Sequence, residues 1–490
     1  MPLNILNINI YSVLPEIALA ILAMAMMVVD FFAGREHKTI LGTLSVIGLV
    51  IILPVAYMTV EAGQSFGGMV IADGFSAFFS VIFIIAAIFT IIISTAYLKK
   101  VDVTRGEYYY TVIFATLGMM VMAKSNDLIN MYVGIELMAL SFYILVAFRI
   151  DNSRSVEGAL KYFVLGALSS GILLYGISFA YGFAGSTSLP EIAHRIAGTK
   201  GPLHDPFLML SVAFIAVGLS FKVALFPFHI WAPDVYEGAP TPITAFLSVG
   251  SKAAAFAVFL RVFASAFPAL KPQWSELLWG LSAATMVFGS IVAISQKNIV
   301  RMLAYSSIAH AGIILIGLIA FNSAGFSGVM YYLLVYVFMN VGAFTVVTLH
   351  IRDNGKGEDI NDYKGLSQRR PLLSFLMALF LLSLAGIPPT GGFTAKFFIL
   401  AAAVDAHYYW LAAIGVAATA ISLFFYAKVI FYMYMKEPEA DDEGLVGEAK
   451  ASDFAYHVVL LLTAAGTMFI GVYPAPFMEM AVKAVRPLLM

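Results

Sequence analysis

The chain has 490 residues, of which 61% are hydrophobic and only 12% are charged, and its formal net charge is −1. No soluble domain of this length keeps so much apolar surface in water, so we expect an integral membrane protein surrounded by a lipid bilayer. The nearly balanced charge gives no electrostatic reason to expect a nucleic-acid partner. Cysteine is absent, which excludes disulfides and cysteine-ligated iron–sulfur clusters from this chain.

Apolar runs of about 20 residues, enough to cross a hydrocarbon core about 30 Å thick, recur almost from end to end. In chain order, we predict fourteen spans at 13–33, 40–61, 74–98, 108–123, 127–148, 157–182, 206–232, 241–265, 275–295, 300–321, 325–349, 372–404, 407–435 and 455–473. The predicted fold class is therefore an all-α polytopic membrane protein. The first run has spanning length and no positive region before it, so no cleavable secretory signal is expected.

Prolines interrupt two of these spans. Pro227 lies in the seventh, and Pro388 and Pro389 lie in the twelfth. Proline removes a backbone donor and breaks the helical hydrogen-bond ladder, so we predict two half-helices in each of these spans. The two spans lie five apart and run in opposite directions, as two inverted five-helix repeats (spans 4–8 and 9–13) with an ion pathway near the midplane would require. Packing kinks are the alternative for either break in isolation.

This organisation predicts an N-terminal three-helix segment, two five-helix repeats, and an acidic loop with a C-terminal helix, at 1–107, 108–265, 275–436 and 437–490. Lys and Arg accumulate on the cytoplasmic side of membrane proteins. Here they concentrate in the connections after odd-numbered spans, so both termini are predicted to lie outside, with Lys124 among the few basic residues on that side. The connection KEPEADDEGLVGEAKASD is interpreted as a solvated loop.

Ionisable side chains within the spans are the candidate functional groups, because an ionised residue at the centre of a membrane helix costs about 2.5–3.5 kcal/mol and normally faces the protein interior. The candidates are Glu136, Lys161, Lys222, Lys252 and Lys396. A buried ion pair that only fixes helix register is the alternative for four of them. Lys161, only a turn or so into its helix, could instead snorkel to the interface, and snorkelling is the favoured interpretation for Arg261 and Lys428 near their helix ends.

Amines and a carboxylate held in a low-dielectric interior suit proton transfer, because their protonation responds to a neighbouring charge or to water. We expect the pair Glu136 and Lys222 to start a relay that continues through Lys252 to Lys396. The groups expected to bridge the gaps, together with water, are Tyr305, Ser306, Ser307 and His310 of the tenth span. His229, just beyond Pro227, is the candidate gate of the cytoplasmic entrance. A structural hydrogen-bonded role is the alternative for each histidine.

Five segments of the sequence carry a resemblance to a known family. They are GIELMALSFYIL, EGALKYFVLGALSSGILLYG, FKVALFPFHIWAPDVYEGAPTPITAFLSVGSKAAAFAVFLR, RMLAYSSIAHAG and PLLSFLMALFLLSLAGIPPTGGFTAKFFIL. In this order they resemble the antiporter-like membrane subunits of respiratory complex I, and they look most like the subunit N branch of bacterial NADH-quinone oxidoreductases. The resemblance covers nearly the whole chain, and the block FPFHxWxPDxYEGxPTPxT is highly specific. The chain ends soon after the fourteenth span, which argues against the subunit L relatives and their long lateral helix.

The resemblance implies both an activity and a set of partners. It implies that Glu136, Lys222, Lys252 and Lys396 translocate protons through two half-channels, with Lys161 as the additional lysine of the sixth span. It also implies that NADH, FMN, iron–sulfur clusters and quinone are bound by partner subunits and not by this chain, which would have no independent catalytic activity. The implied partners are the other membrane subunits, further antiporter-like subunits among them, and indirectly the peripheral redox arm, in a bacterial inner membrane with periplasmic termini.

Two other functions stay open at this point. A subunit of an Mrp-type Na⁺/H⁺ antiporter shares the same helices and ionisable groups, and it would transport sodium without any electron-transfer partner. A structural spacer, in which the charges only specify packing, is the second alternative. Replacing Lys222 or Lys396 by alanine would distinguish a spacer, because a spacer would retain pumping once it is assembled.

Overall fold

The computed structural model of the protein describes residues 8–34, 38–60, 62–199, 205–351, 357–438 and 454–489. Most of the predicted acidic loop, residues 439–453, lies outside the described residues. Five of the basic residues used to predict the orientation also lie outside them, namely Arg35, Lys200, Arg352, Lys356 and Lys450.

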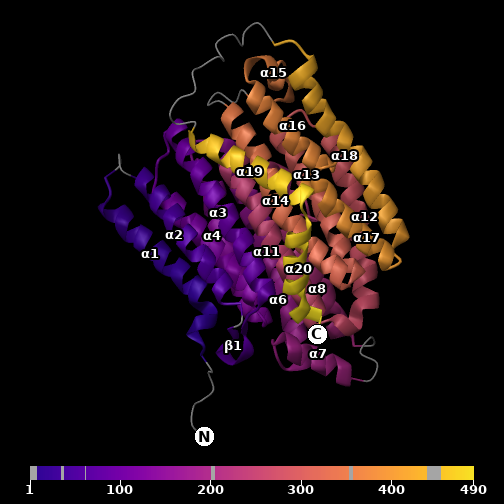
Figure 1. Ribbon diagram of the computed structural model, residues 1–490. Coiled ribbons are helices and arrows are strands. Elements are labelled where there is room, and N and C mark those ends of the chain that lie inside the picture. Colours follow the sequence, from indigo (N-terminus) through magenta and orange to yellow (C-terminus); the bar gives the residue numbers. More distant parts are fainter. Residues whose placement is uncertain are drawn as a thin grey trace.

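The described chain forms a bundle of helices (Figure 1). Its first part contains η1 (Ile10–Val13), α1 (Leu14–Phe32), α2 (Thr39–Met58), β1 (Gly63–Ser65), η3 (Phe66–Gly68), β2 (Val70–Ala72), α3 (Gly74–Lys100), α4 (Glu107–Lys124), α5 (Leu128–Val146), α6 (Ser153–Ala184), α7 (Leu189–Gly198), α8 (Pro206–Lys222), α9 (Trp231–Gly238), α10 (Thr241–Phe246), η5 (Leu247–Ser251) and α11 (Lys252–Ser265). Its second part contains η6 (Pro268–Leu270), α12 (Lys271–Ser295), α13 (Ile299–Ala320), α14 (Ser323–His350), η7 (Ile360–Tyr363), α15 (Leu366–Arg369), α16 (Pro371–Ala385), α17 (Gly391–Asp405), α18 (Tyr409–Met435), α19 (Phe454–Val472) and α20 (Ala475–Leu489).

Eleven segments of the described chain are helical, long and apolar enough to cross a membrane. They coincide with predicted spans 1–3, 5, 6, 8–11, 13 and 14, which confirms a polytopic helical membrane protein. Predicted span 4 is α4, an 18-residue helix that begins with a glutamate and three tyrosines and is therefore less apolar. Predicted spans 7 and 12 are the interrupted ones, and each is divided into shorter helices.

The predicted break in the seventh span is confirmed. Helix α8 ends at Lys222, and the chain stays unwound through Pro227 until α9 begins at Trp231. The second half-helix, α9, continues past the predicted limit of this span at residue 232 and ends at Gly238. The second half-helix is short, since its 8 residues rise only about 12 Å.

The twelfth span is broken as predicted, between α16 and α17, at the unwound segment that contains Pro388 and Pro389. Gly386 ends α16 with a φ of 86°, a left-handed conformation that glycine adopts without a steric penalty. A Cβ added at Gly386 would lie 3.0 Å from Cδ of Lys396, so space also favours glycine there. The two halves are 15 residues each, unlike those of the seventh span. The peptide bonds that precede Pro227 and Pro389 are both cis.

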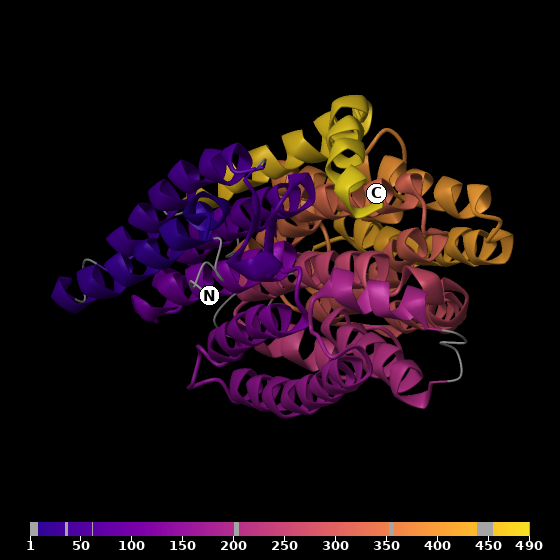
Figure 2. The ribbon, with the colours of Figure 1, turned by 90° about the horizontal axis from the view of Figure 1, so that it is seen from below.

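The eighth predicted span lies at the centre of the bundle. Residues 241–265, which comprise α10, the π-helical turn η5 and α11, are completely enclosed by other helices, and α13 and α14 are nearly so. Helices α1, α2 and α18 are much more exposed, and Figure 2 shows the first two helices at one edge of the molecule and α18 at the opposite edge. Side chains of α11 and α13 are therefore shielded from lipid by other helices.

Three elements were not predicted from the sequence. Strands β1 and β2 form an antiparallel hairpin with Gly63 opposite Ala72. Helix α7 follows α6, and α20 packs against α14 and α3 and ends at the end of the bundle where α1 begins (Figure 1). Both helices are amphipathic and have 15 residues or fewer, so neither contains the long apolar window by which a membrane span is recognised.

The interpretation of Arg261 as a snorkelling side chain is wrong. Its guanidinium is 2% exposed and donates two hydrogen bonds of 2.9 Å to the carboxylate of Asp73. It also lies 4.7 Å from the ring centroid of Phe75. Asp73 is the N-cap of α3 and accepts a further hydrogen bond from the backbone of Ser76. The arginine therefore stays inside because a carboxylate fixed by helix capping pairs with it.

Lys124 does not lie in an exposed connection, as the orientation argument assumed. It ends α4, is buried, and donates to the Glu16 carboxylate at 2.8 Å and to the backbone carbonyl of Ser12 at 2.8 Å. Lys428, in contrast, is half-buried and donates to the carbonyl of Gln296 at the C-terminal end of α12, with a distance of 3.3 Å. Its flexible stem reaches toward a helix end, as expected for a snorkelling lysine.

Candidate functional site

Lys222 lies at the break of the seventh span because it is the last residue of α8. Its ammonium is buried and donates to the hydroxyl of Ser170 on α6 at 3.4 Å. The charge of Glu136 on α5 acts on Lys222, but no carboxylate oxygen of Glu136 lies within 4.0 Å of the ammonium. The two residues predicted to start the relay are therefore electrostatic neighbours without direct contact.

Lys252 is the first residue of α11 and directly follows the π-helical turn η5. Its ammonium donates to both the backbone carbonyl and the hydroxyl of Ser307 on α13. The turn is tied to α14 because the amide of Asn340 donates to Ser248 at 2.6 Å. Single π-helical turns within α-helices are frequently found at functional sites. Of the predicted bridging groups, the structure thus brings Ser307 into contact with the central lysine.

The side chain of Lys396 bridges the two half-helices of the twelfth span. It belongs to α17, yet its ammonium donates to the carbonyls of Leu384 and Ala385, at 2.8 and 3.1 Å. These are the last carbonyls of α16, which have no partner inside their own helix. A cation at this position is also stabilised by the negative end of the helix dipole. The break therefore creates the binding site for the lysine side chain.

His310 interacts electrostatically with both the central and the terminal lysine, because the charges of Lys252 and Lys396 act on it. Its ring nitrogens share hydrogen bonds with the hydroxyls of Tyr332 at 2.5 Å and Tyr426 at 3.2 Å. The Tyr426 hydroxyl also pairs with Ser306. This cluster joins α13, α14 and α18 by neutral groups that can both donate and accept protons.

The two tyrosines of this cluster were missed by the sequence reasoning. A signal was present, since Tyr332 and Tyr336 are four residues apart and therefore share one face of α14. The ammonium of Lys252 lies 6.0 Å from the ring centroid of Tyr336, on the same face. Nothing in the sequence around Tyr426 indicated its role, because its contacts come from another part of the chain.

Three of the predicted residues lie apart from this network. Tyr305 packs on Phe288, with 6.5 Å between ring centroids. His229 is buried between Phe226 and Phe288, and its Nδ1 has no hydrogen-bond partner among the described residues. The side chain of Lys161 is 42% exposed and pairs with the carboxylates of Glu157 and Asp234.

An ionic cluster at one end of the bundle joins α6, α9, α13 and the segment before η7. Its members are Arg154, Glu157, Lys161, Asp234, Glu237, Arg301 and Glu358. Asp234 accepts from Lys161 at 2.6 Å and from Arg301 at 2.8 Å. Burial alone would raise the pKa of Asp234, but these two cations hold it below its usual range. The motif PDVYEG contains Asp234 and Glu237, but the sequence alone did not indicate which cations pair with these two carboxylates.

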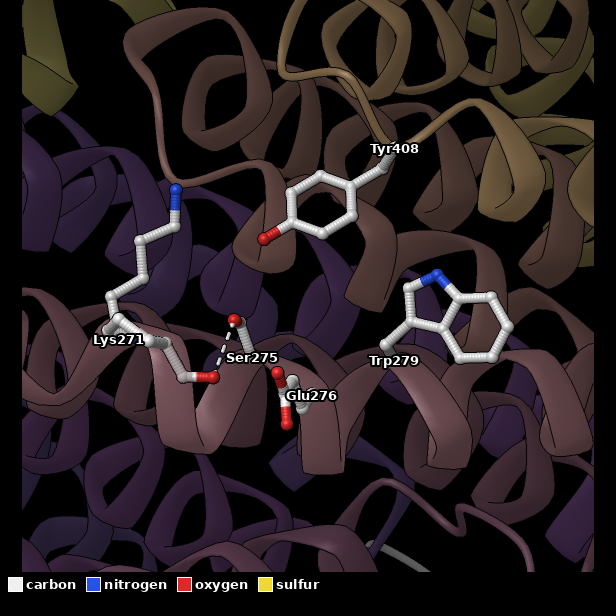
Figure 3. A pocket seen from close by; sticks show the side chains of 6 residues that line it. Lys271, Ser275, Glu276, Trp279 and Tyr408 are labelled. Atoms are coloured by element: carbon white, nitrogen blue, oxygen red, sulfur yellow. Dashed lines mark hydrogen bonds between the residues drawn. The ribbon is translucent and has the colours of Figure 1, made fainter.

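Two cavities adjoin the helix ends. One, of about 530 Å³, is lined by Lys271, Pro272, Ser275, Glu276, Trp279 and Tyr408 (Figure 3), and none of the predicted site residues faces it. The other, of about 280 Å³, lies beside the ionic cluster and between its charged side chains. In the described ranges no three His, Asp or Glu side chains form a group that could hold a metal ion. The expected absence of a bound cofactor stays a prediction.

Comparison with known proteins identifies relatives over the whole chain. Residues 125–422 match the family model described as NADH:quinone oxidoreductase/Mrp antiporter, TM. Subunit N of NADH-quinone oxidoreductase from Trichlorobacter lovleyi is 42% identical over 484 residues, which cover 98% of each chain. The same subunit from Desulforamulus reducens is 42% identical over 486 residues, covering 99% of this chain and 100% of the relative.

The relationship extends to a solved structure. A chain of respiratory complex I from Thermus thermophilus, determined with bound aureothin, superposes with a TM-score of 0.79 and 30% sequence identity. The match covers 95% of this chain and 98% of that one. Motif order, overall fold and sequence identity over the full length therefore agree. The chain belongs to the family of NADH-quinone oxidoreductase subunit N, within the larger group of NADH:quinone oxidoreductase and Mrp antiporter membrane proteins.

Proposed function

We propose that this chain is a proton-translocating membrane subunit of an NADH-quinone oxidoreductase. Protons pass along a row formed by Glu136, Lys222, Lys252, His310 and Lys396. NADH oxidation and quinone reduction take place in partner subunits, which bind the cofactors, and this chain has no independent catalytic activity. Its partners are the other membrane subunits, including further antiporter-like subunits, and indirectly the peripheral redox arm.

The observation that carries this proposal is the difference between two kinds of buried cation. Arg261 and Lys124 each contact a carboxylate. Lys222, Lys252 and Lys396 are 4%, 2% and 4% exposed, and no carboxylate oxygen of the described chain lies within 4.0 Å of them. Their partners are hydroxyls and backbone carbonyls. Loss of a proton from these three lysines leaves only neutral oxygens behind, whereas neutralising Arg261 or Lys124 would leave a buried carboxylate unpaired.

Polar groups along the row support proton transfer between the lysines. The cluster around His310 is composed of groups that can donate and accept, and it is reached by the charges of Lys252 and Lys396. Oε1 of Glu136 and the hydroxyl of Tyr143 are buried and have no hydrogen-bond partner among the described residues. Buried polar atoms are nearly always satisfied by protein or by water. Water at these atoms would extend the row toward Lys222.

The membrane topology is part of the same proposal. Fourteen spans form an N-terminal segment (1–107), two inverted five-helix repeats (108–265 and 275–436) and a C-terminal part (437–490). Two helix breaks in oppositely directed spans, each with a buried lysine beside it, support the inverted repeats. The protein resides in a bacterial inner membrane with both termini outside. Figure 1 supports this arrangement of termini, since α1 begins and α20 ends at the same end of the bundle.

An Mrp-type Na⁺/H⁺ antiporter subunit is the alternative, because the matching family model is described by both names. The two relatives at 42% identity are both described as subunit N of NADH-quinone oxidoreductase, which favours the proton-pumping oxidoreductase. Purification of the chain with its companions separates the two functions. Flavin and iron–sulfur subunits would support the oxidoreductase, and small hydrophobic antiporter subunits would support the Mrp assignment.

The direct test is Lys252→Met in the assembled complex. Methionine retains the unbranched stem of the side chain but removes the proton-carrying amine. We expect assembly to persist and proton pumping coupled to NADH oxidation to fall, measured as acidification of proteoliposomes per NADH oxidised. Lys99→Met, at an exposed lysine, is the matched control and should pump normally. Normal pumping by an assembled Lys252→Met complex would contradict the proposal.

A further inference from the structure

The cavity beside the ionic cluster reaches from charged side chains at the bundle end to a buried tyrosine. Its volume is about 280 Å³, and its lining includes Arg154, Glu237 and Glu358 on the charged side. Tyr236 of α9 also lines it, although only 2% of this residue is exposed. The tyrosine therefore forms the inner limit of a polar space whose outer side is ionic.

Tyr236 connects this space with the central lysine. Its hydroxyl lies near the hydroxyl of Ser307, and Ser307 in turn accepts from the ammonium of Lys252. The position of Tyr236 is fixed from both sides, since Thr244 donates to its backbone carbonyl at 2.8 Å and its ring packs edge-on against Trp231. Tyr236 and Ser307 are thus the polar groups that lie between the cavity and Lys252.

We infer that this cavity is the aqueous entrance from which protons reach Lys252, and that Tyr236 is the last group between its water and Ser307. The inference rests on the proposed function, because it assigns an entrance to the same row of lysines. It differs from the entrance expected from the sequence, which was placed at His229. That histidine is packed between two phenylalanine rings, whereas the cavity is lined by charges.

The proton transfer balances without a further reactant. A protonated water in the cavity gives a proton to the Tyr236 oxygen while the tyrosine hydroxyl proton passes to Ser307. The serine hydroxyl proton passes to the neutral amine of Lys252, which becomes an ammonium. Three bonds to hydrogen form and three break, and both hydroxyls are regenerated. Rotation of the two hydroxyl groups then restores the starting orientation.

The carboxylate at the cavity wall suits collection of protons from solvent. Burial raises the pKa of Glu358 above its ordinary value, and the charge of Arg154 only partly opposes this. Glu237 adds a second negative charge nearby, and the amide of Asn298 donates to Glu358 at 3.2 Å. A carboxyl with a raised pKa is protonated at a higher pH than an exposed one, so it can exchange protons between solvent and the cavity.

Tyr236→Phe is the first test, made in the complete complex. It removes the hydroxyl but retains the ring that packs against Trp231. We expect NADH-driven pumping by proteoliposomes to be lost or reduced per NADH oxidised, with assembly and the size of the complex unchanged. Tyr363→Phe, at another buried tyrosine outside the row, is the matched control and should pump normally. An assembled Tyr236→Phe complex that pumps like the wild type would overturn the inference.

Because the natural chain has no cysteine, a single thiol can report on access to the cavity. Val300→Cys places this thiol on the cavity wall, and Ala324→Cys places one at an exposed position beyond the other end of α13. We expect a small charged methanethiosulfonate to react at both positions but to reduce pumping only in Val300→Cys, with recovery on addition of dithiothreitol. The unsubstituted complex is the control for reaction of the methanethiosulfonate with cysteines of other subunits.

The outcomes separate the two proposals. No reaction at Val300→Cys, or complete reaction without loss of pumping, refutes the entrance. If Lys252→Met abolishes pumping while Tyr236→Phe and modified Val300→Cys retain it, the row of lysines stands and only the entrance is wrong. If Lys252→Met pumps normally, the proposed function itself has failed.

Discussion

Removal of Arg261 should destabilise the protein without affecting proton transfer. In Arg261→Met the carboxylate of Asp73 loses two hydrogen bonds of 2.9 Å in a site where it is almost completely buried. Breaking one partner of a buried ion pair costs about 3–5 kcal/mol, because the remaining charge is neither hydrated nor paired. We therefore expect the free energy of unfolding to fall by this amount, while the protons pumped per NADH by the assembled complex stay unchanged.

A second substitution separates the charge effect from packing. Adding Asp73→Asn to Arg261→Met removes the stranded carboxylate, and asparagine still caps the N-terminus of α3. The loss that persists is the stacking of the guanidinium on Phe75, about 0.5–2 kcal/mol. The double variant should therefore be about 1–4.5 kcal/mol more stable than the single one. Chemical denaturation of the purified chain in detergent, followed by tryptophan fluorescence, measures both differences.

Two results would refute this reasoning. Equal instability of the single and double variants would mean that packing and not the unpaired charge determines the cost. Loss of pumping by an assembled Arg261→Met complex would mean that a cation paired with a carboxylate also takes part in transport. The distinction between paired structural cations and unpaired functional lysines would then be wrong.

Three further substitutions test separate features of the structure. Lys124→Met should destabilise the protein by about 3–5 kcal/mol because Glu16 loses its partner, and Glu16→Gln should restore much of this in the double variant, measured by the same denaturation assay. Gly392→Ala should prevent assembly, since an added Cβ would lie 1.8 Å from a backbone carbonyl oxygen of α16. Gly182→Ala is the control and should assemble, because an added Cβ there meets nothing within 4 Å. Native gels measure assembly of both variants. Asp234→Asn should lower stability near neutral pH. Its difference from the wild type should disappear as the pH falls, because a carboxyl whose pKa is lowered by folding stabilises the protein only while it is ionised. This stabilisation is complete above the ordinary aspartate pKa of about 3.9 and is lost as the pH falls through the lower pKa of the folded state.

The ionic cluster and the row of lysines have different surroundings, and this difference shapes what each can do. The cluster is partly exposed, so its pairs are screened by solvent and contribute modestly to stability. Its position beside the cavity agrees with the proposed entrance for protons. The three lysines are buried, so their charges are screened less than charges at the surface, and each change of charge there acts strongly on the next group in the row.

The sequence alone determined the membrane character, most spans and both helix breaks. These properties are local: about 20 consecutive apolar residues suffice to predict a span, and a proline disrupts the hydrogen bonds of its own helix. The candidate lysines could also be identified from the local sequence, because a charged residue inside an apolar run can be recognised without knowing its partner in the folded chain. Short amphipathic helices such as α20 lack such a signal and were missed.

Only the tertiary structure decided which charges are paired and which are not. Arg261 and Asp73 are 188 positions apart in the chain, and Lys124 and Glu16 are 108 apart, so no local pattern predicts these ion pairs. The same holds for Ser307 beside Lys252, a contact between residues 55 positions apart. Whether a buried cation fixes the fold or carries a proton depends on the atoms around it, and those atoms come from helices that meet only after the chain has folded.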